Sequence, residues 1–160
     1  MGWLARKRLD WLERGLDALH RTARRRGVVI APHLETGHEG ERAAYFYLRR
    51  KGYVIVARRW SAGHVDGDLD LIAWQGPTLC FVEVKTRTAH FITPAEFAVD
   101  HHKRRVLRRM ARHYLRHLPS ETAPPVRFDV ISVYLVPGRP KEITHIQSSF
   151  GWSERRNERD

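Results

Sequence analysis

Two neighbouring segments, 64–74 and 78–87, constrain the fold most, because together they predict a β-hairpin with both faces covered. A turn centred between Gly76 and Pro77 pairs residues whose numbers sum to 153, and side chains alternate between the two faces of a strand. One face is then wholly apolar, with Leu69, Leu71, Ala73, Cys80, Val82 and Val84. The other is apolar near the turn, with Ile72, Trp74, Leu79 and Phe81. Such a hairpin is expected at the centre of a sheet flanked by helices.

The same register gathers charge at the end of the hairpin away from the turn. Asp70 faces Glu83, Asp68 faces Lys85, and all four side chains share one face. Each buried ion costs several kcal/mol unless it is compensated, and one lysine cannot neutralise three carboxylates. Clustered carboxylate oxygens are the ligands that Mg²⁺ or Mn²⁺ prefers, so a metal site is one interpretation. The alternative is an ion-pair cluster whose cations come from Arg58, Arg59 or Arg87.

The rest of the block 37–150 predicts a mixed α/β domain. A capping box from Thr36 to Glu39 predicts a helix that runs to Lys51. Strands are expected at 53–59, 126–136 and 142–146, besides the two of the hairpin. A second capping box, Thr93 to Glu96, starts a helical pattern that extends to Leu118 and leaves a break near Asp100 open. The order α-β-β-β-α-β-β implies a mixed central β-sheet flanked by helices.

Residues 1–36 form a basic arm before this domain, and 151–160 form a short charged tail. The arm predicts one amphipathic helix over 3–26, because its apolar residues recur at heptad-like spacing: Ala5, Leu9, Leu12, Leu16, Leu19 and Ala23. Three interpretations stay open. The helix packs on its own domain or a second copy, follows nucleic-acid phosphates, or lies on a membrane surface.

The charge balance indicates polyanionic partners. Lys and Arg total 29 against 18 acidic residues, a formal net charge of +11, which favours nucleic acid first and an anionic membrane surface second. The single Cys80 excludes an internal disulfide. No apolar run approaches the roughly 18–20 residues of a membrane-spanning helix, and the N-terminus lacks the apolar region of a signal peptide. We therefore expect a cytoplasmic protein without integral membrane association.

The second helix concentrates this positive charge. No acidic residue lies between His101 and His117, and seven positions are basic: Lys103, Arg104, Arg105, Arg108, Arg109, Arg112 and Arg116. One interpretation is a surface that follows phosphates, and the other is a solvated basic face. Phosphate contacts carry no base code, so structure-selective or non-specific binding is expected rather than sequence readout.

Two further acids attract attention by their position. Glu41 shares the inner face of the first helix with Ala44, Tyr45 and Leu48, where a carboxylate needs a partner. Either it forms a salt bridge to an arginine, or it is a fourth acidic group over the hairpin cluster. Asp129 lies inside a strand and is interpreted as a supporting group behind the ligands or as an acid that orients the backbone.

These motifs resemble a known family. The chain resembles the YraN-like (UPF0102-type) family of small bacterial proteins. The motifs that carry the resemblance are Gly37-x-x-Gly40-Glu41, Gly52-Tyr53, Gly67-Asp68-Leu69-Asp70-Leu71-Ile72-Ala73, Phe81-Val82-Glu83-Val84-Lys85-x-Arg87 and Arg127-Phe128-Asp129-Val130. That family is placed in the PD-(D/E)XK nuclease superfamily, with a restriction-endonuclease-like core, near archaeal Holliday-junction resolvases. The resemblance covers about residues 37–150. Two departures are Asp68, where the family usually has Glu, and Arg59, near a position where it tends to have Asn.

The resemblance implies a Mg²⁺- or Mn²⁺-dependent endonuclease that hydrolyses phosphodiester bonds in DNA. It implies that Asp70 and Glu83, with the Val84 carbonyl, hold the metal, that Lys85 orients water or stabilises charge, and that Glu41 acts at the metal. Asp68, Asp129 and Lys103 would support these groups. DNA is favoured over RNA, and a homodimer is plausible by analogy. The alternatives are a non-catalytic nucleic-acid-binding protein on this fold and an interaction module that recruits partners through the N-terminal helix.

Overall fold

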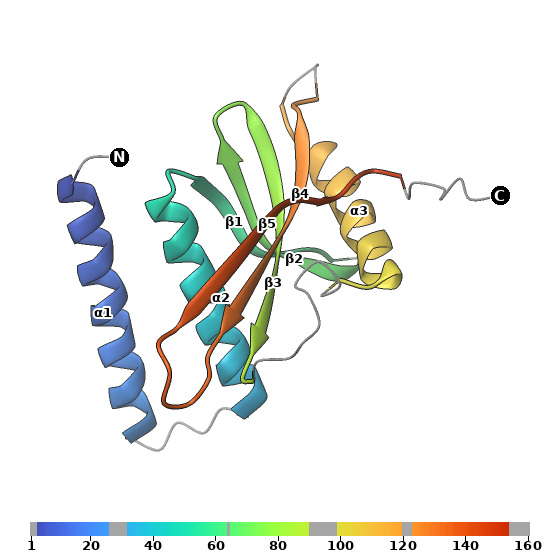
Figure 1. The fold of residues 1–160 in the computed structure, drawn as a ribbon. Coiled ribbons are helices and arrows are strands. Elements are labelled where there is room, and N and C mark those ends of the chain that lie inside the picture. Colours follow the sequence, from blue (N-terminus) through green and yellow to red (C-terminus); the bar gives the residue numbers. More distant parts are fainter. Residues whose placement is uncertain (1–2, 26–31, 64, 90–98, 120–122, 154–160) are drawn as a thin grey trace.

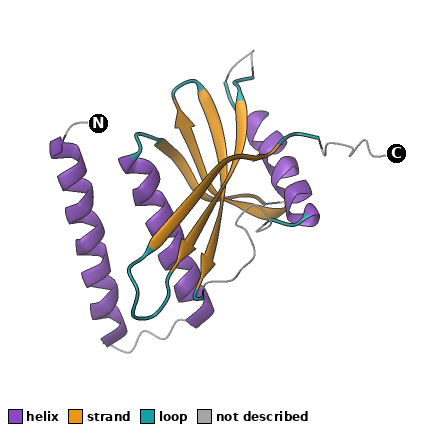
Figure 2. Cartoon of the chain, in the orientation of Figure 1, coloured by secondary structure: helices purple, strands orange, loops and turns teal. Residues whose placement is uncertain are grey.

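The computed structural model describes residues 3–25, 32–63, 65–89, 99–119 and 123–153. Its elements follow the predicted order, and Figures 1 and 2 show them: α1 (Trp3–Arg25), α2 (Pro32–Arg50), β1 (Val54–Ala62), β2 (Val65–Gln75), β3 (Thr78–Arg87), α3 (His101–Leu115), β4 (Val126–Tyr134) and β5 (Glu142–Phe150). The strands form one five-stranded sheet in the order β1-β2-β3-β4-β5. Only the β3–β4 pair among them is parallel, so the predicted mixed α/β architecture is confirmed.

From Leu71 to Gln75, the hairpin of β2 and β3 has the predicted register. Its pairs run from Leu71 opposite Val82 to Gln75 opposite Thr78, and each pair sums to 153. Beyond Leu71 the predicted alternation is wrong for Leu69, which packs with Ile72 on the α3 side of the sheet instead of with Leu71. α3 covers the face that carries Ile72 and Phe81, where its buried side chains include Leu107 and Met110. α2 covers the face that carries Leu71 and Val82, with Ala44 and Leu48 against it. The hairpin is therefore central, as expected for a strand pair that is apolar on both faces.

The start of α2 differs from the prediction. The helix begins at Pro32, so Thr36 lies inside it and the predicted N-cap is wrong. Proline is well tolerated in the first turn, where its missing N–H has no partner to lose, and it starts the helix a turn earlier than the capping-box pattern indicates. The C-terminal end is as predicted, because Gly52 takes φ +87° directly after the last turn.

α3 begins at the break that the sequence left open. Asp100 is its N-cap, and the Asp100 side chain accepts a hydrogen bond of 2.7 Å from the Lys103 N–H. The second capping box, Thr93 to Glu96, lies outside the described residues. α3 therefore starts two residues before Lys103, and this brings the N-terminal turn of the helix to the charged end of β2 and β3.

α1 lies beside α2 (Figure 1) and contacts the domain through its acidic residues. Arg50 Nε lies 2.8 Å from Asp10 Oδ1, Arg50 also pairs with Glu13, and Lys141 Nζ lies 2.9 Å from Glu13 Oε1. Much of the heptad-like stripe instead faces solvent: Leu12, Leu16 and Leu19 are exposed, as is Trp11. The helix thus packs on its own domain with a polar side. No helix among the described residues is long and apolar enough to cross a membrane.

Candidate active site

A cluster of three carboxylates and two lysines forms where β2, β3 and α3 meet on the α3 face of the sheet. Glu83 is 2% exposed, and its Oε1 atom lies 2.8 Å from Lys85 Nζ. Lys103 Nζ lies 3.2 Å from Glu83 Oε2 and 3.6 Å from Asp68 Oδ1. Asp70 completes the cluster, since it interacts electrostatically with both Glu83 and Lys103. The alternation read from the sequence therefore brings these acids to one place, and Lys103 joins them from α3.

Asp70 is held in a position that disfavours its charge. Burial first, and the neighbouring Glu83 carboxylate second, raise the pKa of Asp70 to about 7. The Val84 N–H, which donates a 2.7 Å hydrogen bond to Asp70 Oδ2, and the Lys103 ammonium only partly oppose this rise. Asp70 therefore changes charge close to neutral pH, a property more typical of functional sites than of structural ion pairs.

The carboxylate of Glu83 is also incompletely satisfied. Its Oε2 atom is buried and has no hydrogen bond from the described residues, so its contact with Lys103 is an ion pair only. Burial lowers the pKa of Lys103, but Glu83 and Asp70 outweigh burial and raise it. The Lys103 ammonium is thus stabilised by a pair of carboxylates that repel each other.

This donor set fits a hard divalent cation. Two carboxylates with an unsatisfied buried oxygen match the ligands of Mg²⁺, which usually takes one or two protein carboxylates and completes its shell with water and substrate phosphate. The described residues contain no group of three or more His, Cys, Asp or Glu side chains placed to hold a metal. An ion held by Asp70 and Glu83 would therefore need water or substrate oxygens to complete its shell.

Glu41 does not join the cluster in this structure. Both of its carboxylate oxygens accept hydrogen bonds from Arg59, at 2.6 and 2.9 Å, which is the salt bridge that the sequence left as an alternative. Arg59 has φ +47°, and asparagine, the residue that the resemblance led us to expect near here, adopts this conformation more readily than most. Glu41 raises the pKa of Arg59 most, and the carboxylates of Asp70 and Asp68 raise it further. Arg59 therefore interacts electrostatically with both Glu41 and the cluster.

Asp129 lies on the other face of the sheet. It pairs with Val82 across β3 and β4, and its carboxylate accepts two hydrogen bonds from Arg127, at 2.8 and 2.9 Å. The Ser148 N–H and His145 Nε2 each lie 3.0 Å from its oxygens. The structure does not bring Asp129 to the carboxylate cluster. Sequence reasoning missed the partner His145, because no local pattern links residues on separate strands.

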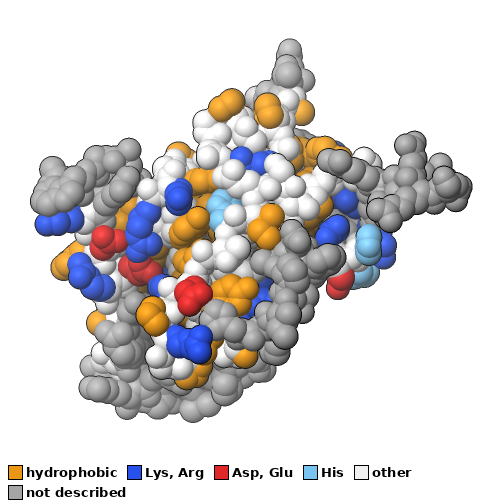
Figure 3. Space-filling view, viewed as in Figure 1, with side chains coloured by type: hydrophobic (Ala, Val, Ile, Leu, Met, Phe, Trp, Pro, Cys, Tyr) orange, Lys and Arg blue, Asp and Glu red, His pale blue; other side chains and the backbone are white. Residues whose placement is uncertain are grey.

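The arginines of α3 divide into two sets. Arg105, Arg109, Arg112 and Arg116 are exposed, and Figure 3 shows cationic side chains over α3 at one edge of the molecule. Arg104 Nε instead donates to the Val99 carbonyl at 2.9 Å, and the buried Arg108 donates from Nε to the Gly151 carbonyl at 2.8 Å. Arg104 and Arg108 also lie over the Phe150 ring. The structure thus narrows the candidate phosphate-binding set to the exposed four.

Comparison with known proteins identifies the family. Residues 40–133 match the family described as "Uncharacterised protein family UPF0102". The chain belongs to the UPF0102 family. A UPF0102 protein of Koribacter versatilis is 54% identical over 119 residues, 74% of this chain and 80% of the relative. One of Porphyromonas gingivalis is 41% identical over 131 residues, 81% of this chain and 94% of the relative.

The UPF0102 match includes the whole candidate site. Asp68, Asp70, Glu83, Lys85 and Lys103 fall inside residues 40–133, as do Glu41 and Asp129. Helix α1 lies outside it. A UPF0102 protein of Nocardia farcinica is 44% identical over 117 residues, 71% of this chain and 87% of the relative. The carboxylate cluster therefore belongs to the part of the chain that defines the family.

Proposed function

We propose that this UPF0102 protein is a divalent-metal-dependent endonuclease that hydrolyses phosphodiester bonds in DNA. We also place its core with the restriction-endonuclease-like fold of the PD-(D/E)XK nucleases. One observation carries the proposal: Asp70 and Glu83 form a poorly compensated carboxylate pair, with Lys85 2.8 Å from Glu83. A fold that needed only stability has no reason to keep two repelling acids at a largely buried position.

Asp70 and Glu83 would hold a Mg²⁺ or Mn²⁺ ion, with the Val84 carbonyl as a further oxygen. Such an ion supplies Lewis acidity toward a phosphate oxygen and lowers the pKa of water. Lys85 orients the attacking water through its ammonium group or stabilises the charge that develops on the phosphate. Lys103, which contacts Glu83 and Asp68, is placed to take a similar electrostatic role. The Val84 N–H holds the Asp70 carboxylate in its orientation.

DNA is the proposed substrate because the cluster lies beside a basic helix. Arg105, Arg109, Arg112 and Arg116 are exposed, and their charge attracts the phosphate backbone without reading bases. Selectivity for nicked, flapped or branched DNA therefore fits the protein better than selectivity for a base sequence.

The test is cleavage of nicked, branched and linear DNA with and without Mg²⁺ or Mn²⁺. We expect nicking that needs the metal and falls at least about 100-fold in Asp70→Asn and in Lys85→Met. Glu39→Gln, which neutralises an exposed acid on α2, is the matched control and keeps full activity. Unchanged nicking in both site variants would refute the assignment. Metal-independent DNA binding without cleavage would favour the non-catalytic alternative.

A second candidate function rests on α1. Trp11 is 73% exposed and Leu19 67% exposed, an apolar surface that favours recruitment of a partner or of a second copy. Leu12→Asp combined with Leu19→Asp leaves the contacts of Asp10 and Glu13 intact. If α1 drives self-association, the sedimenting mass falls to that of a monomer in this variant. An unchanged mass contradicts a homodimer formed through α1.

A further inference from the structure

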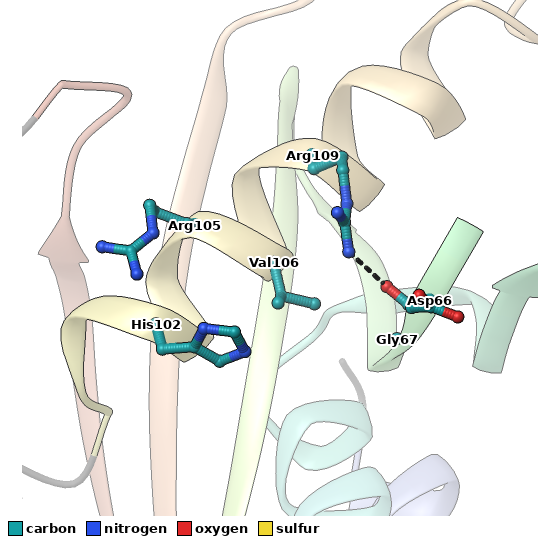
Figure 4. Close-up of a pocket in the computed structure, with 6 residues that line it drawn as sticks. All are labelled: Asp66, Gly67, His102, Arg105, Val106 and Arg109. Carbon is teal, nitrogen blue, oxygen red and sulfur yellow. Dashed lines mark hydrogen bonds between the residues drawn. The ribbon is translucent and has the colours of Figure 1, made fainter.

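A basic groove runs beside the carboxylate cluster, between β2 and the first three turns of α3 (Figure 4). Its volume is about 540 Å³, and it is lined by Asp66, Gly67, His102, Arg105, Val106 and Arg109. Three of these six residues carry a guanidinium or an imidazole. The Asp66 carboxylate lies on the side away from His102 and Arg105 (Figure 4). The two guanidinium groups outnumber the one carboxylate, so the lining of the groove carries a net positive charge.

The groove is built by a close approach of the two elements. Gly67 has φ +116°, and a Cβ atom there would lie 2.4 Å from Val106 Cγ1, so only glycine lets α3 come this near. Arg109 Nη2 donates a 2.7 Å hydrogen bond to the Asp66 carbonyl, which ties the third turn of α3 to β2. Arg105 is exposed at the other side of the groove. One side of the groove is held by the Arg109 hydrogen bond, and the other side carries the exposed Arg105 guanidinium. The groove therefore has a defined shape and is more than a group of separate surface charges.

On both elements, a residue that lines the groove directly precedes a residue of the cluster. Gly67 precedes Asp68 on β2, and His102 precedes Lys103 on α3. Lys103 Nζ contacts both Asp68 and Glu83. Arg109 lies six residues beyond Lys103, a rise of about 9 Å along the helix. At about 3.4 Å of duplex axis per phosphate of one strand, this distance corresponds to about three nucleotides.

We infer that this groove binds one backbone phosphate of the DNA strand that is cut, within about three nucleotides of the cleaved bond. Arg105 is the main contact, and the groove thereby sets where the strand lies against Asp70 and Glu83. This inference rests on the proposed function for its reference point, but the binding it describes does not require cleavage. Because the ligand is a phosphate and not a base, the groove contributes position without sequence preference.

Arg112 offers a matched comparison with Arg105. Both are exposed arginines on the same face of α3, seven residues apart, and they therefore contribute equally to a purely diffuse attraction. Arg112 lies outside the groove, with its guanidinium 5.4 Å from the centre of the Trp152 ring. Different effects of the two substitutions would separate a phosphate-binding groove from general charge.

The experiment measures binding of a short nicked duplex in which one phosphate at a time is replaced by a neutral methylphosphonate. The protein is full-length and carries Asp70→Asn, so that cleavage does not interfere. Neutralising the phosphate that occupies the groove weakens binding about fivefold in this protein, but by less than about twofold once Arg105→Ala is added. Adding Arg112→Ala leaves the fivefold effect in place, and Arg105→Lys restores part of it.

The outcomes are distinct from those of the nuclease test. If the same phosphate matters equally with Arg105→Ala and with Arg112→Ala, the groove does not hold it and the inference is overturned, whatever the cleavage assays show. If the Arg105-dependent phosphate is present but the wild-type protein cuts no DNA, the groove stands and the proposed endonuclease fails. Absence of any phosphate with an effect that depends on Arg105 also overturns the inference.

Discussion

Two aspartates lie on opposite faces of the same sheet, and their surroundings differ sharply. Asp129 is fully buried on the α2 face, where Arg127, His145 and the Ser148 N–H all bond to its oxygens. Asp70 lies on the α3 face, with a hydrogen bond from the Val84 N–H and a second carboxylate, Glu83, as neighbour. Burial raises the pKa of both groups, yet the bonds from His145 and Arg127 leave that of Asp129 below its usual value. The pKa of Asp70 rises to about 7.

The difference separates an acid that stabilises the fold from an acid that is kept for chemistry. A buried carboxylate with a full set of hydrogen-bond donors stabilises the fold, and removing it leaves those donors unpaired. A carboxylate whose pKa is raised by a second carboxylate lowers the stability of the fold when it is ionised, unless a cation binds beside it. From the sequence, Asp70 is a candidate metal ligand, and Asp129 is either a supporting group or an acid that orients the backbone. The partners decide between the two.

Asp129→Ala gives the largest expected change in stability. The substitution leaves the half-buried Arg127 guanidinium without its anion, and we expect a loss of about 3 kcal/mol in the free energy of unfolding near neutral pH. Because the folded-state pKa is lowered, this contribution is present above the unfolded pKa of about 3.9 and is lost as the pH falls through the folded value. Urea unfolding at several pH values measures it. A loss below about 1 kcal/mol would remove the contrast with Asp70.

Asp70→Asn is expected to act in the opposite direction. The raised carboxyl pKa means that the penalty is absent below the unfolded pKa near 4, grows as the pH rises toward 7 and is complete above it. Asn keeps an acceptor for the Val84 N–H, so near pH 8 the metal-free variant should be more stable than the wild type by up to about 3 kcal/mol. Near pH 4 the two should unfold alike. Asp68→Asn, at the exposed acid of the same site, is the control. A destabilised Asp70→Asn protein at high pH contradicts the assignment.

Added Mn²⁺ should produce the smallest of the three effects. At about ten times the dissociation constant, a ligand that binds only the folded protein adds about 1.4 kcal/mol to the free energy of unfolding. The ion needs Asp70 deprotonated, so this gain is larger near pH 8 than near pH 5, and it disappears in Asp70→Asn. Thermal unfolding with and without Mn²⁺ measures the gain. Equal stabilisation of the Asp70→Asn variant places the ion elsewhere.

The sheet was predictable from the sequence because its signals are local. The turn at Gly76 fixes which residues of β2 and β3 face each other from Leu71 to Gln75. Extending the period of two placed Asp70 and Glu83 on one face, and the two carboxylates do lie close enough to interact. The start of α2 was missed, although it too is local, because Pro32 and Thr36 carry competing start signals. What α1 packs against stayed open for another reason. Its apolar stripe is a local pattern, but Arg50 and Lys141, which draw its acidic side inward, lie far along the chain.

By itself, the sequence determined that three acids and a lysine share the end of a hairpin covered on both faces. It did so because alternation along a strand is a property of the backbone and needs no tertiary contact. Only the tertiary structure decided which cation meets which acid. Lys103 forms ion pairs with Glu83 and Asp68, and Arg59 forms one with Glu41. Asp129 pairs with Arg127 and His145. Long charged side chains pair with whatever opposite charge lies within reach. Those distances are set by the packing of α2 and α3 on the sheet and by the pairing of β5 with β4.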